Sequence, residues 1–247
     1  MCIRDRFSII ENIVACLELH IEQGKVLEQK NIDIGIVRSI PSISRFSVEV
    51  NGQAGHSGTI LMDQRADALV TSSEIITFVN KLASRLAKES NQHFVSTIGK
   101  INVHPNAAAI IPGKVEMTID LRASSKSSRD QYIKELEKQV ETMNQSGPCK
   151  IKMKNIAFAP YVEMDKELVK LFKISSDEYG FSNIIMDSGA GHDTAHLSRV
   201  ASASMIFVPC MDGLSHCPEE YAEISDISKG TSVLFKMVEK LASLNQN

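Results

Sequence analysis

The chain has 247 residues, of which 43% are hydrophobic and 23% are charged, and its net charge is −3. This length allows one domain or two, and the composition is typical of a globular protein. Basic residues form no long run, and no apolar stretch reaches the roughly 20 residues that a membrane helix needs. We therefore expect neither a nucleic-acid partner nor a membrane partner.

The cysteines indicate a reducing environment. There are five, an odd number without a CxxC pair: Cys2, Cys16, Cys149, Cys210 and Cys217. Scattered cysteines of this kind favour reduced thiols in a cytoplasmic protein over a disulfide framework. Residues 1–6 read neither as a signal peptide nor as a helix start. They are either foreign sequence in front of a partial gene or a disordered native N-terminus.

Residues 7–40 combine short elements of different kinds. Apolar residues at positions 9, 10, 13 and 14 have helical spacing, and residues 16–21 predict a short buried strand. Gly24 interrupts the pattern, a brief helix begins at Val26, and residues 32–40 predict another strand. We expect this segment to be part of a catalytic domain that lacks its N-terminal strands.

Residues 41–158 predict a complete small domain. Strands are expected around Phe46–Val50, at 95–103, at 115–121 and at 151–158. Helices are expected at 63–88 and after Ser128, where Ser128-x-x-Gln131 has the form of a capping box. The order βαββαβ is that of a ferredoxin-like domain, with two helices on one antiparallel sheet. Because such a sheet often leaves a face or an edge for a partner, we expect dimerisation through this domain.

Residues 159–247 return to alternating helices and strands. Helices are expected at 165–178 and 226–244, with strands at 184–186 and 203–208 and a short helix between them. This alternation predicts a piece of a parallel α/β sheet with too few strands to close a core alone. The fold class is therefore α/β, with one partial parallel-sheet domain formed by residues 7–40 and 159–247 and interrupted by the ferredoxin-like insert.

Four of the seven histidines stand in unusual local sequences: His20, His56, His192 and His216. Three follow predicted strands of the α/β part, and open α/β sheets bind ligands at the carboxyl ends of their strands. Imidazole is a common metal ligand, and Glu22, Asp193, Glu219 or Glu220 are candidates to orient it. A single histidine after a strand is more often a turn residue, but the group favours a metal site. A catalytic zinc needs about three protein ligands, so the sequence shows part of such a site.

Six motifs occur in an order and spacing that resemble one enzyme family. They are LHIEQG at 19–24, GHSG at 55–58, IPG at 111–113, DLR at 120–122, SGAGHD at 188–193 and FVPxxxGxSHxPxE at 207–220. The chain resembles the N-carbamoyl-amino-acid hydrolases, β-ureidopropionases and allantoate amidohydrolases, a branch of the M20 metallopeptidase superfamily. The resemblance runs from about residue 14 to the C-terminus.

The resemblance implies a catalytic domain with two divalent metal ions and an inserted dimerisation lid. Zinc or manganese would fit best, and cobalt or nickel are also compatible. His20 and His216 are implied as metal ligands, one for each ion, and Gln23 as a substrate contact. His56 is implied as a lid histidine that reaches the partner subunit's site. His192 is implied as a contact of the tetrahedral intermediate, and Arg122 as the clamp for the substrate carboxylate.

The sequence departs from the family pattern in two ways. The earlier ligands and the general base of the family lie upstream, and this chain does not contain them, so we expect the chain alone to be inactive. The family also places a substrate-binding asparagine two residues before Ile111, where this chain has Ala109. Either this contact is lost or another residue such as Asn106 supplies it, so the substrate class stays open.

The expected function is hydrolysis of a carbamoyl or ureido C–N bond in a small carboxylate-bearing substrate. An aminoacylase or dipeptidase of the same superfamily is the first alternative, although LHIEQG and GAGHD argue against it. A non-catalytic dimerisation or binding module is the second, because the lid is complete in this chain and the metal site is not. The histidines and the arginine at motif positions favour an enzyme.

Overall fold

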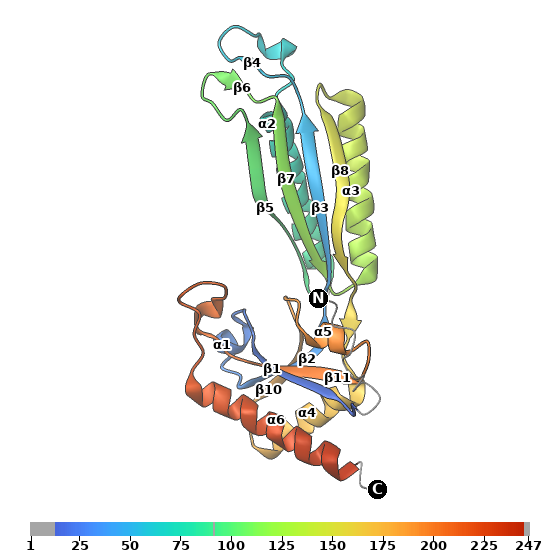
Figure 1. Cartoon of the computed structure of the whole chain (residues 1–247), viewed down its shortest axis with the longest axis vertical. Coiled ribbons are helices and arrows are strands. Elements are labelled where there is room, and N and C mark those ends of the chain that lie inside the picture. Colours follow the sequence, from blue (N-terminus) through green and yellow to red (C-terminus); the bar gives the residue numbers. More distant parts are fainter. Residues whose placement is uncertain (1–12, 91, 245–247) are drawn as a thin grey trace, which may run out of the picture. The chain divides into compact units, whose positions relative to one another are not determined.

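The computed structural model describes residues 13–90 and 92–244, which form two compact units (Figure 1). Pro41–Tyr161 make up the inserted unit, and the segments before and after it make up the flanking unit. Part of the helix expected at 9–14 lies outside the described residues, and residues 13–15 form no regular element. Each unit has its own core and is described separately.

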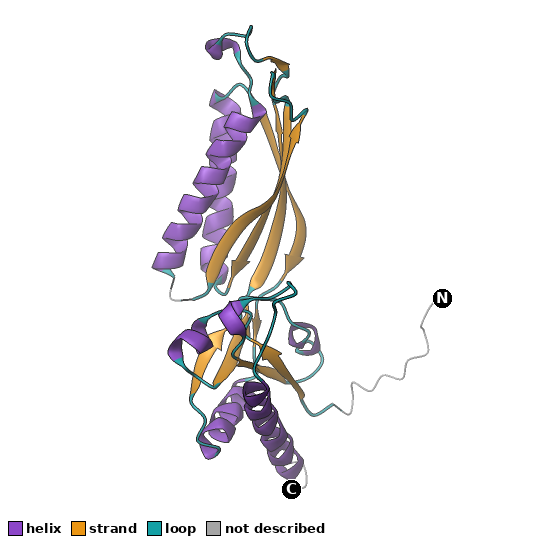
Figure 2. Cartoon of the chain, turned by 90° about the vertical axis from the view of Figure 1, so that its left-hand side faces the viewer, coloured by secondary structure: helices purple, strands orange, loops and turns teal. Residues whose placement is uncertain are grey.

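The inserted unit is a four-stranded antiparallel sheet with two helices. Its elements in chain order are β3 (Ser42–Asn51), α2 (Ala68–Glu89), β5 (Phe94–His104), β7 (Lys114–Ala123), α3 (Lys126–Ser146) and β8 (Lys150–Ala159). The strands lie in the order β5-β7-β3-β8, and each pairs antiparallel to its neighbour. Both helices cover the same face of the sheet (Figure 2). This is the βαββαβ order that the sequence predicts.

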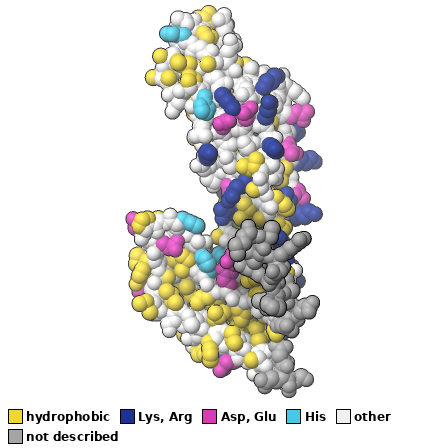
Figure 3. All heavy atoms as spheres, in the orientation of Figure 1, with side chains coloured by type: hydrophobic (Ala, Val, Ile, Leu, Met, Phe, Trp, Pro, Cys, Tyr) yellow, Lys and Arg dark blue, Asp and Glu magenta, His cyan; other side chains and the backbone are white. Residues whose placement is uncertain are grey.

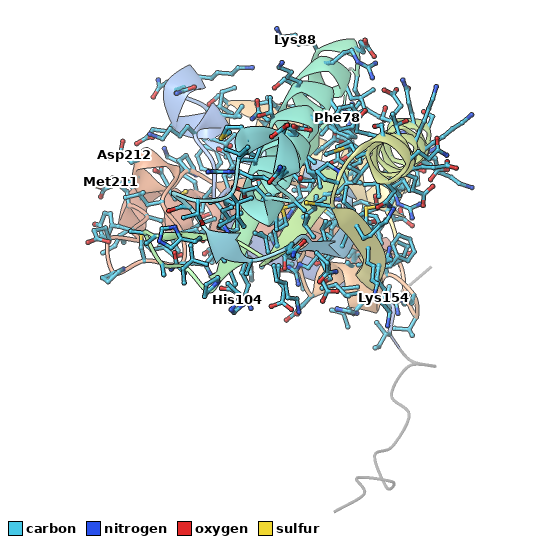
Figure 4. All side chains as sticks on the ribbon, turned by 90° about the horizontal axis from the view of Figure 1, so that it is seen from above. Phe78, Lys88, His104, Lys154, Met211 and Asp212 are labelled. Carbon is cyan, nitrogen blue, oxygen red and sulfur yellow. The ribbon has the colours of Figure 1, made fainter. Side chains whose placement is uncertain are left out.

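Strand periodicity determines which face of this sheet the helices cover. In β7, Val115, Met117, Ile119 and Leu121 are all at most 2% exposed and belong to one core with residues of α2 and α3. The residues between them, from Lys114 to Arg122, are polar and half-buried on the other face. Figure 4 shows this separation, with Phe78 of α2 on the helical side and His104 and Lys154 across the sheet from it.

The start of α3 differs from the prediction. Ser128 lies inside the helix, and the N-cap is Ser125, whose hydroxyl accepts a hydrogen bond from the backbone N–H of Ser128 at 3.3 Å. The predicted capping box at Ser128 was therefore wrong by three residues. Both serines precede acceptable helix formers, and the local pattern alone does not choose between them.

A small two-stranded sheet lies beyond the end of β3. It pairs β4 (Gly55–His56) with β6 (Ile110–Ile111), and the 3-10 turn η2 (Met62–Gln64) follows β4. The guanidinium of Arg65 fastens this loop by donating to the carbonyl of Ser57 at 2.6 Å and to that of Ile60 at 3.1 Å. His56 is thus held in an ordered turn at one end of the inserted unit.

The flanking unit has a mixed sheet. Its strands are β1 (Cys16–Ile21), β2 (Ile34–Ile40), β9 (Val162–Glu163), β10 (Asn183–Asp187) and β11 (Ala203–Val208). They lie in the order β1-β11-β2-β10, with β9 also beside β2. The pairs β1–β11 and β2–β10 are parallel, whereas β2 is antiparallel to β11 and to β9. The predicted all-parallel sheet was therefore wrong.

The short connection between β1 and β2 explains this mixture. It contains only the five-residue helix α1 (Val26–Lys30), which spans about 7.5 Å. A strand of six residues is roughly 20 Å long, so α1 cannot carry the chain back to the other end of the sheet, as a parallel crossover requires. Strand β2 consequently runs opposite to β1, with β11 between them.

Helices lie on both faces of this sheet (Figure 1). Helices α4 (Lys166–Glu178) and α6 (Ile224–Leu244) cover one face, where Phe172, Val233 and Met237 pack around Ile206. On the other face, Leu27 of α1 and Ala195 of α5 (Thr194–Leu197) contribute to a core around Phe207. The side chains of β1 alternate between the two faces and are half-buried, so the prediction of a buried strand was wrong.

The surfaces of the two units differ in character. Figure 3 shows hydrophobic side chains gathered on the visible face of the flanking unit, while Lys and Arg side chains are frequent on the inserted unit. Exposed apolar residues of α6 contribute, among them Ile224 at 78% and Phe235 at 61% exposure. No helix among residues 13–90 and 92–244 is both long enough and apolar enough to cross a membrane.

Replacing Leu136 with alanine tests the core of the inserted unit. Leu136 is fully buried on α3, so the cavity and lost apolar contacts should lower the free energy of unfolding by roughly 2–5 kcal/mol. Glu137→Ala, on the neighbouring exposed position of the same helix, is the control and should change it by less than about 0.5 kcal/mol. Urea unfolding followed by hydrogen exchange of β7 peptides reports on this unit alone. Equal effects of the two variants would contradict the described packing.

Candidate functional site

Strand β1 presents two functional side chains on one face of the flanking unit. Leu17, Leu19 and Ile21 pack toward α4 and α6. Because side chains alternate along a strand, Glu18 and His20 point to the opposite face. On that face the His20 ring lies 6.5 Å from the ring of Phe207, its paired residue on β11, measured between centroids.

The hydrogen bond of His20 determines which of its nitrogens can bind a ligand. The Nδ1 atom lies 2.8 Å from the carbonyl oxygen of Ile21. A carbonyl only accepts hydrogen bonds, so Nδ1 carries the proton and Nε2 keeps its lone pair. A backbone carbonyl on one nitrogen and a free lone pair on the other is the usual arrangement of a metal-binding histidine.

His192 lies beside His20 on the same face of the sheet. The two rings are 4.7 Å apart between centroids in an edge-to-face arrangement, and Phe207 lies 5.3 Å from the His192 ring. The Nε2 atom is 2.8 Å from the hydroxyl of Ser188, and the side chain is only 1% exposed. Burial, together with the nearby His20, lowers the pKa of His192 to about 4. The ring is therefore neutral at pH 7.

Glu18 completes this group. Its Oε2 atom accepts hydrogen bonds from the backbone N–H and from the hydroxyl of Thr194, and its Oε1 atom lies 3.8 Å from Nδ1 of His192. Among the described residues, Glu18, His20 and His192 each offer one ligand atom within 4.8 Å of the others. One carboxylate and two imidazoles are a donor set that suits a zinc-like ion.

The loop that carries His216 is fastened to the end of β1. The side-chain amide of Gln23 donates to the hydroxyl of Ser215 at 2.8 Å. The backbone N–H of His216 donates to Glu220 at 2.9 Å, and this bond is the main reason that the pKa of Glu220 is lowered, with smaller contributions from His216 and His20. His216 is thus at the same edge of the sheet as His20, but it does not belong to the group formed by Glu18, His20 and His192.

His56 and Arg122 lie in the inserted unit, at opposite ends of its sheet. Arg122 pairs with Ile43 near the start of β3, while His56 follows the end of β3 at Asn51. The eight residue steps from Ile43 to Asn51 span roughly 26 Å of strand. Arg122 donates through Nε to Asp120 at 3.0 Å, and His56 is exposed, its Nδ1 accepting from the N–H of Gly58 at 3.0 Å.

Ala109 lies next to His56. The carbonyl of Ala109 accepts a hydrogen bond from the N–H of Ser57, which directly follows His56, at 3.0 Å. Asn106 lies in the same connection and has a left-handed backbone with φ 51°. The segment that resembles the family's substrate-binding asparagine region is therefore at the His56 end of the inserted unit.

The candidate carboxylates have different roles from those that the sequence suggests. Glu22 accepts hydrogen bonds at 2.8 Å from the N–H groups of Val26 and Leu27, so it orders the first turn of α1. Asp193 stands at the N-cap of α5 without a side-chain capping bond. Glu18, which the sequence reasoning missed, is the carboxylate beside the histidines. The alternation Leu17-Glu18-Leu19-His20-Ile21 was the signal that could have found it.

Comparison with known proteins agrees with this geometry. Residues 5–240 match the model of peptidase family M20/M25/M40. The chain belongs to this family. Over 94% of its length it is 38% identical to an N-carbamoyl-L-amino-acid amidohydrolase of Pseudomonas sp. (strain NS671) and 37% identical to an allantoate amidohydrolase of Bacillus subtilis (strain 168).

A solved structure of the M20 family extends this likeness to the fold. A hydantoinase/carbamoylase family amidase from Burkholderia multivorans superposes with a TM-score of 0.87 at 31% identity, over 93% of this chain and 55% of that one. The chain also spans 55% of each of the two relatives named above. It therefore corresponds to about half the length of these proteins.

M20 hydrolases generally depend on divalent metal ions, and the residues of the flanking unit fit such an ion. The Nε2 lone pair of His20 is not engaged by its own hydrogen bond, the neighbouring His192 is neutral, and one oxygen of Glu18 is turned toward them. All three are the protonation and hydrogen-bonding states that metal ligands require.

The lowered pKa of His192 predicts a pH-dependent stability. The folded-state pKa of about 4 lies below the ordinary value of 6.5, so the unfolded chain takes up this proton first as the pH falls. Stability should be unaffected above pH 6.5 and should fall by roughly 2 kcal/mol between pH 6.5 and pH 5. Urea unfolding with a chelator at pH 7 and pH 5, for the parent and His192→Gln, measures this contribution. His56→Gln, at an exposed position, is the control, and a pH effect that survives in His192→Gln would contradict the assignment.

Proposed function

We propose that the chain is the C-terminal part of a metal-dependent amidohydrolase that cleaves a carbamoyl or ureido C–N bond in a small carboxylate-bearing substrate. Membership of the M20 family and the names of its relatives support this class of reaction. The observation that carries the proposal is His20, whose Nδ1–H is bound to the Ile21 carbonyl so that Nε2 is available beside Glu18 and His192.

The proposed roles follow the motifs. His20 and His216 would each hold one of two divalent ions, with zinc or manganese preferred, and a bound ion supplies Lewis-acid activation of water and of the scissile carbonyl. Gln23 would contact the substrate, and it already orders the His216 loop through Ser215. His192, neutral and buried, would hold the developing oxyanion. Arg122 would anchor the substrate carboxylate with its remaining donors.

We further propose that this chain alone does not turn over substrate. Hydrolysis needs a general base as well as an activated water. In the described residues, Glu18 and Glu22 are bound to Thr194 and to the start of α1, so neither is placed as a mobile base. The base and further ligands would come from sequence that corresponds to the other half of the relatives.

A chimera tests this function. The chain would be joined to the upstream part of the Pseudomonas carbamoylase, and ammonia release would be measured with N-carbamoyl-L-amino acids and with allantoate. We expect activity in the chimera and a loss of at least about 1000-fold in His20→Ala, since an activated nucleophile depends on that ligand. Lys88→Ala, exposed at the end of α2, is the control. Amine release from N-acetyl amino acids without ammonia release would favour an aminoacylase instead.

The proposal includes a homodimer formed through the inserted unit. The separation of His56 and Arg122 along β3 supports it, because residues roughly 26 Å apart cannot both contact one small substrate from the same unit. His56 of one subunit would therefore serve the site of its partner. The free thiols of Cys16, Cys149, Cys210 and Cys217 support a reducing, cytoplasmic location for this enzyme.

Mixing two inactive chimeras tests the shared site. His56→Ala and His20→Ala damage different subunits of a shared site, so a mixed dimer contains one site that is intact. After equal amounts are unfolded and refolded together, about a quarter of the parent activity should return, because half of the dimers are mixed and each has one working site. Light scattering would confirm the dimer. If the mixture stays inactive while dimers form, His56 does not act across subunits.

A further inference from the structure

We propose that Glu18, His20 and His192 form a preorganised three-ligand site for one zinc-like ion, with Ser188 and Thr194 as the residues that position its ligands. The inference rests on the metal dependence in the proposed function. It assigns Glu18 and His192 to the ion that His20 binds, and it gives His192 the role of a ligand instead of a contact to the substrate.

The hydroxyl of Ser188 determines the tautomer of His192. It donates to the carbonyl of Ala190 at 3.0 Å and accepts from the N–H of Ala190 at 3.0 Å. A hydroxyl has one proton and two lone pairs, so the remaining position can only accept. His192 Nε2, 2.8 Å away, must therefore donate, and Nδ1 is left with its lone pair.

The alternative tautomer satisfies fewer groups. If Ser188 donated to Nε2 of His192, the hydroxyl could not donate to Ala190, and Nδ1 would carry the proton. That proton would face Oε1 of Glu18 across 3.8 Å, which is too long for a hydrogen bond. The Nε2–H tautomer uses every donor and acceptor around Ser188, which is fully buried.

Thr194 fixes the carboxylate of Glu18 in the same way. Both its backbone N–H and its hydroxyl donate to Oε2, which leaves Oε1 directed at His192. Thr194 is fully buried, so this arrangement does not exchange with solvent. The sheet sets the position of Glu18, and Thr194 sets the orientation of its carboxylate.

Three electron-pair donors consequently converge without a proton between them. They are Oε1 of Glu18, Nε2 of His20 and Nδ1 of His192, and these three residues meet the distance condition for a shared ion. Ligand atoms about 2.1 Å from a tetrahedral zinc lie about 3.4 Å apart. The 3.8 Å between Glu18 and His192 exceeds this by only a few tenths of an ångström. Two histidines, one glutamate and an open position are the ligand set of a catalytic zinc.

Zinc binding to the full 247-residue chain tests the ligand set. Titration calorimetry with Zn(II), and visible absorption with Co(II), would compare the parent with Glu18→Gln, His20→Gln, His192→Gln and His216→Gln. We expect each of the first three to weaken affinity by at least about 10-fold, the lower limit that even a lost outer partner costs. His196→Gln, an exposed histidine on α5, is the matched control. Circular dichroism and hydrogen exchange of the flanking unit confirm that each variant is folded.

Nitrogen-15 spectra test the positioning role of Ser188 without a metal. Long-range proton–nitrogen correlations should show the Nδ1–H tautomer for His20 and the Nε2–H tautomer for His192. In Ser188→Ala the His192 signals should shift toward a mixture of tautomers, and Zn(II) affinity should fall about 10–100-fold, as expected for an outer partner. Finding Nδ1–H on His192 in the parent chain would overturn the assignment of its ligand atom.

The outcomes separate this inference from the proposed function. If His20→Gln and His216→Gln abolish binding while Glu18→Gln and His192→Gln retain it, the three-ligand site is wrong and the proposed amidohydrolase survives. If the parent chain binds no Zn(II), the inference also fails, and the chimera alone decides the function. Loss of binding in Glu18→Gln and His192→Gln, with inactive chimeras, would support the site and reject the proposed function.

Discussion

The parallel pairing of β1 with β11 is the constraint on which the candidate site depends. Its register runs without a break from Cys16 opposite Ala203 to Ile21 opposite Val208, so it joins segments nearly two hundred residues apart in the chain. Because both strands end at the same edge, His20, the His216 loop and the Gln23–Ser215 hydrogen bond lie together there. Each face of β1 then has one task. The leucines of one face hold the strand on α4 and α6, and that anchorage fixes the direction of Glu18 and His20 on the other.

A second feature of the sheet explains how a whole unit can be inserted into this chain. Strand β2 leaves for the inserted unit and β9 returns from it, and the two pair antiparallel through Ser39 with Glu163 and Ile40 with Val162. The entry and exit points are therefore side by side, as an insertion requires if neither core is to be interrupted. Inside the inserted unit, β3 and β8 pair over their whole length from Ile43 opposite Ala159, so the insertion begins and ends with paired strands on both sides of the junction.

The sequence predicted most elements of both units because their signals are local. Strand β11 was predicted with its observed ends, and the alternation in β7 identified its buried face. The errors concern properties that depend on partners. The direction of β2 follows from a helix too short to return along the sheet, and the N-cap of α3 from a choice between nearby serines. In the candidate site, the motifs marked His20 and His192, but Glu18 acquires its role from Thr194, 176 residues away. No local pattern contains that distance.

The backbone near the site is strained where it is also tethered. Gln23 and His216 both adopt left-handed conformations, with φ of 57° and 59°, which cost about 1–3 kcal/mol for residues other than glycine. Gln23 is held by its bond to Ser215, and the N–H of His216 by its bond to Glu220. Each bond contributes about 1 kcal/mol, more where the acceptor is charged, which is comparable with the strain at each residue. The two conformations therefore support each other across the edge of the sheet, because releasing Gln23 removes a tether of the loop that contains His216. Strain that is balanced locally in this way orients both side chains before any ligand binds, and it places the cost of that orientation in the fold instead of in the binding step.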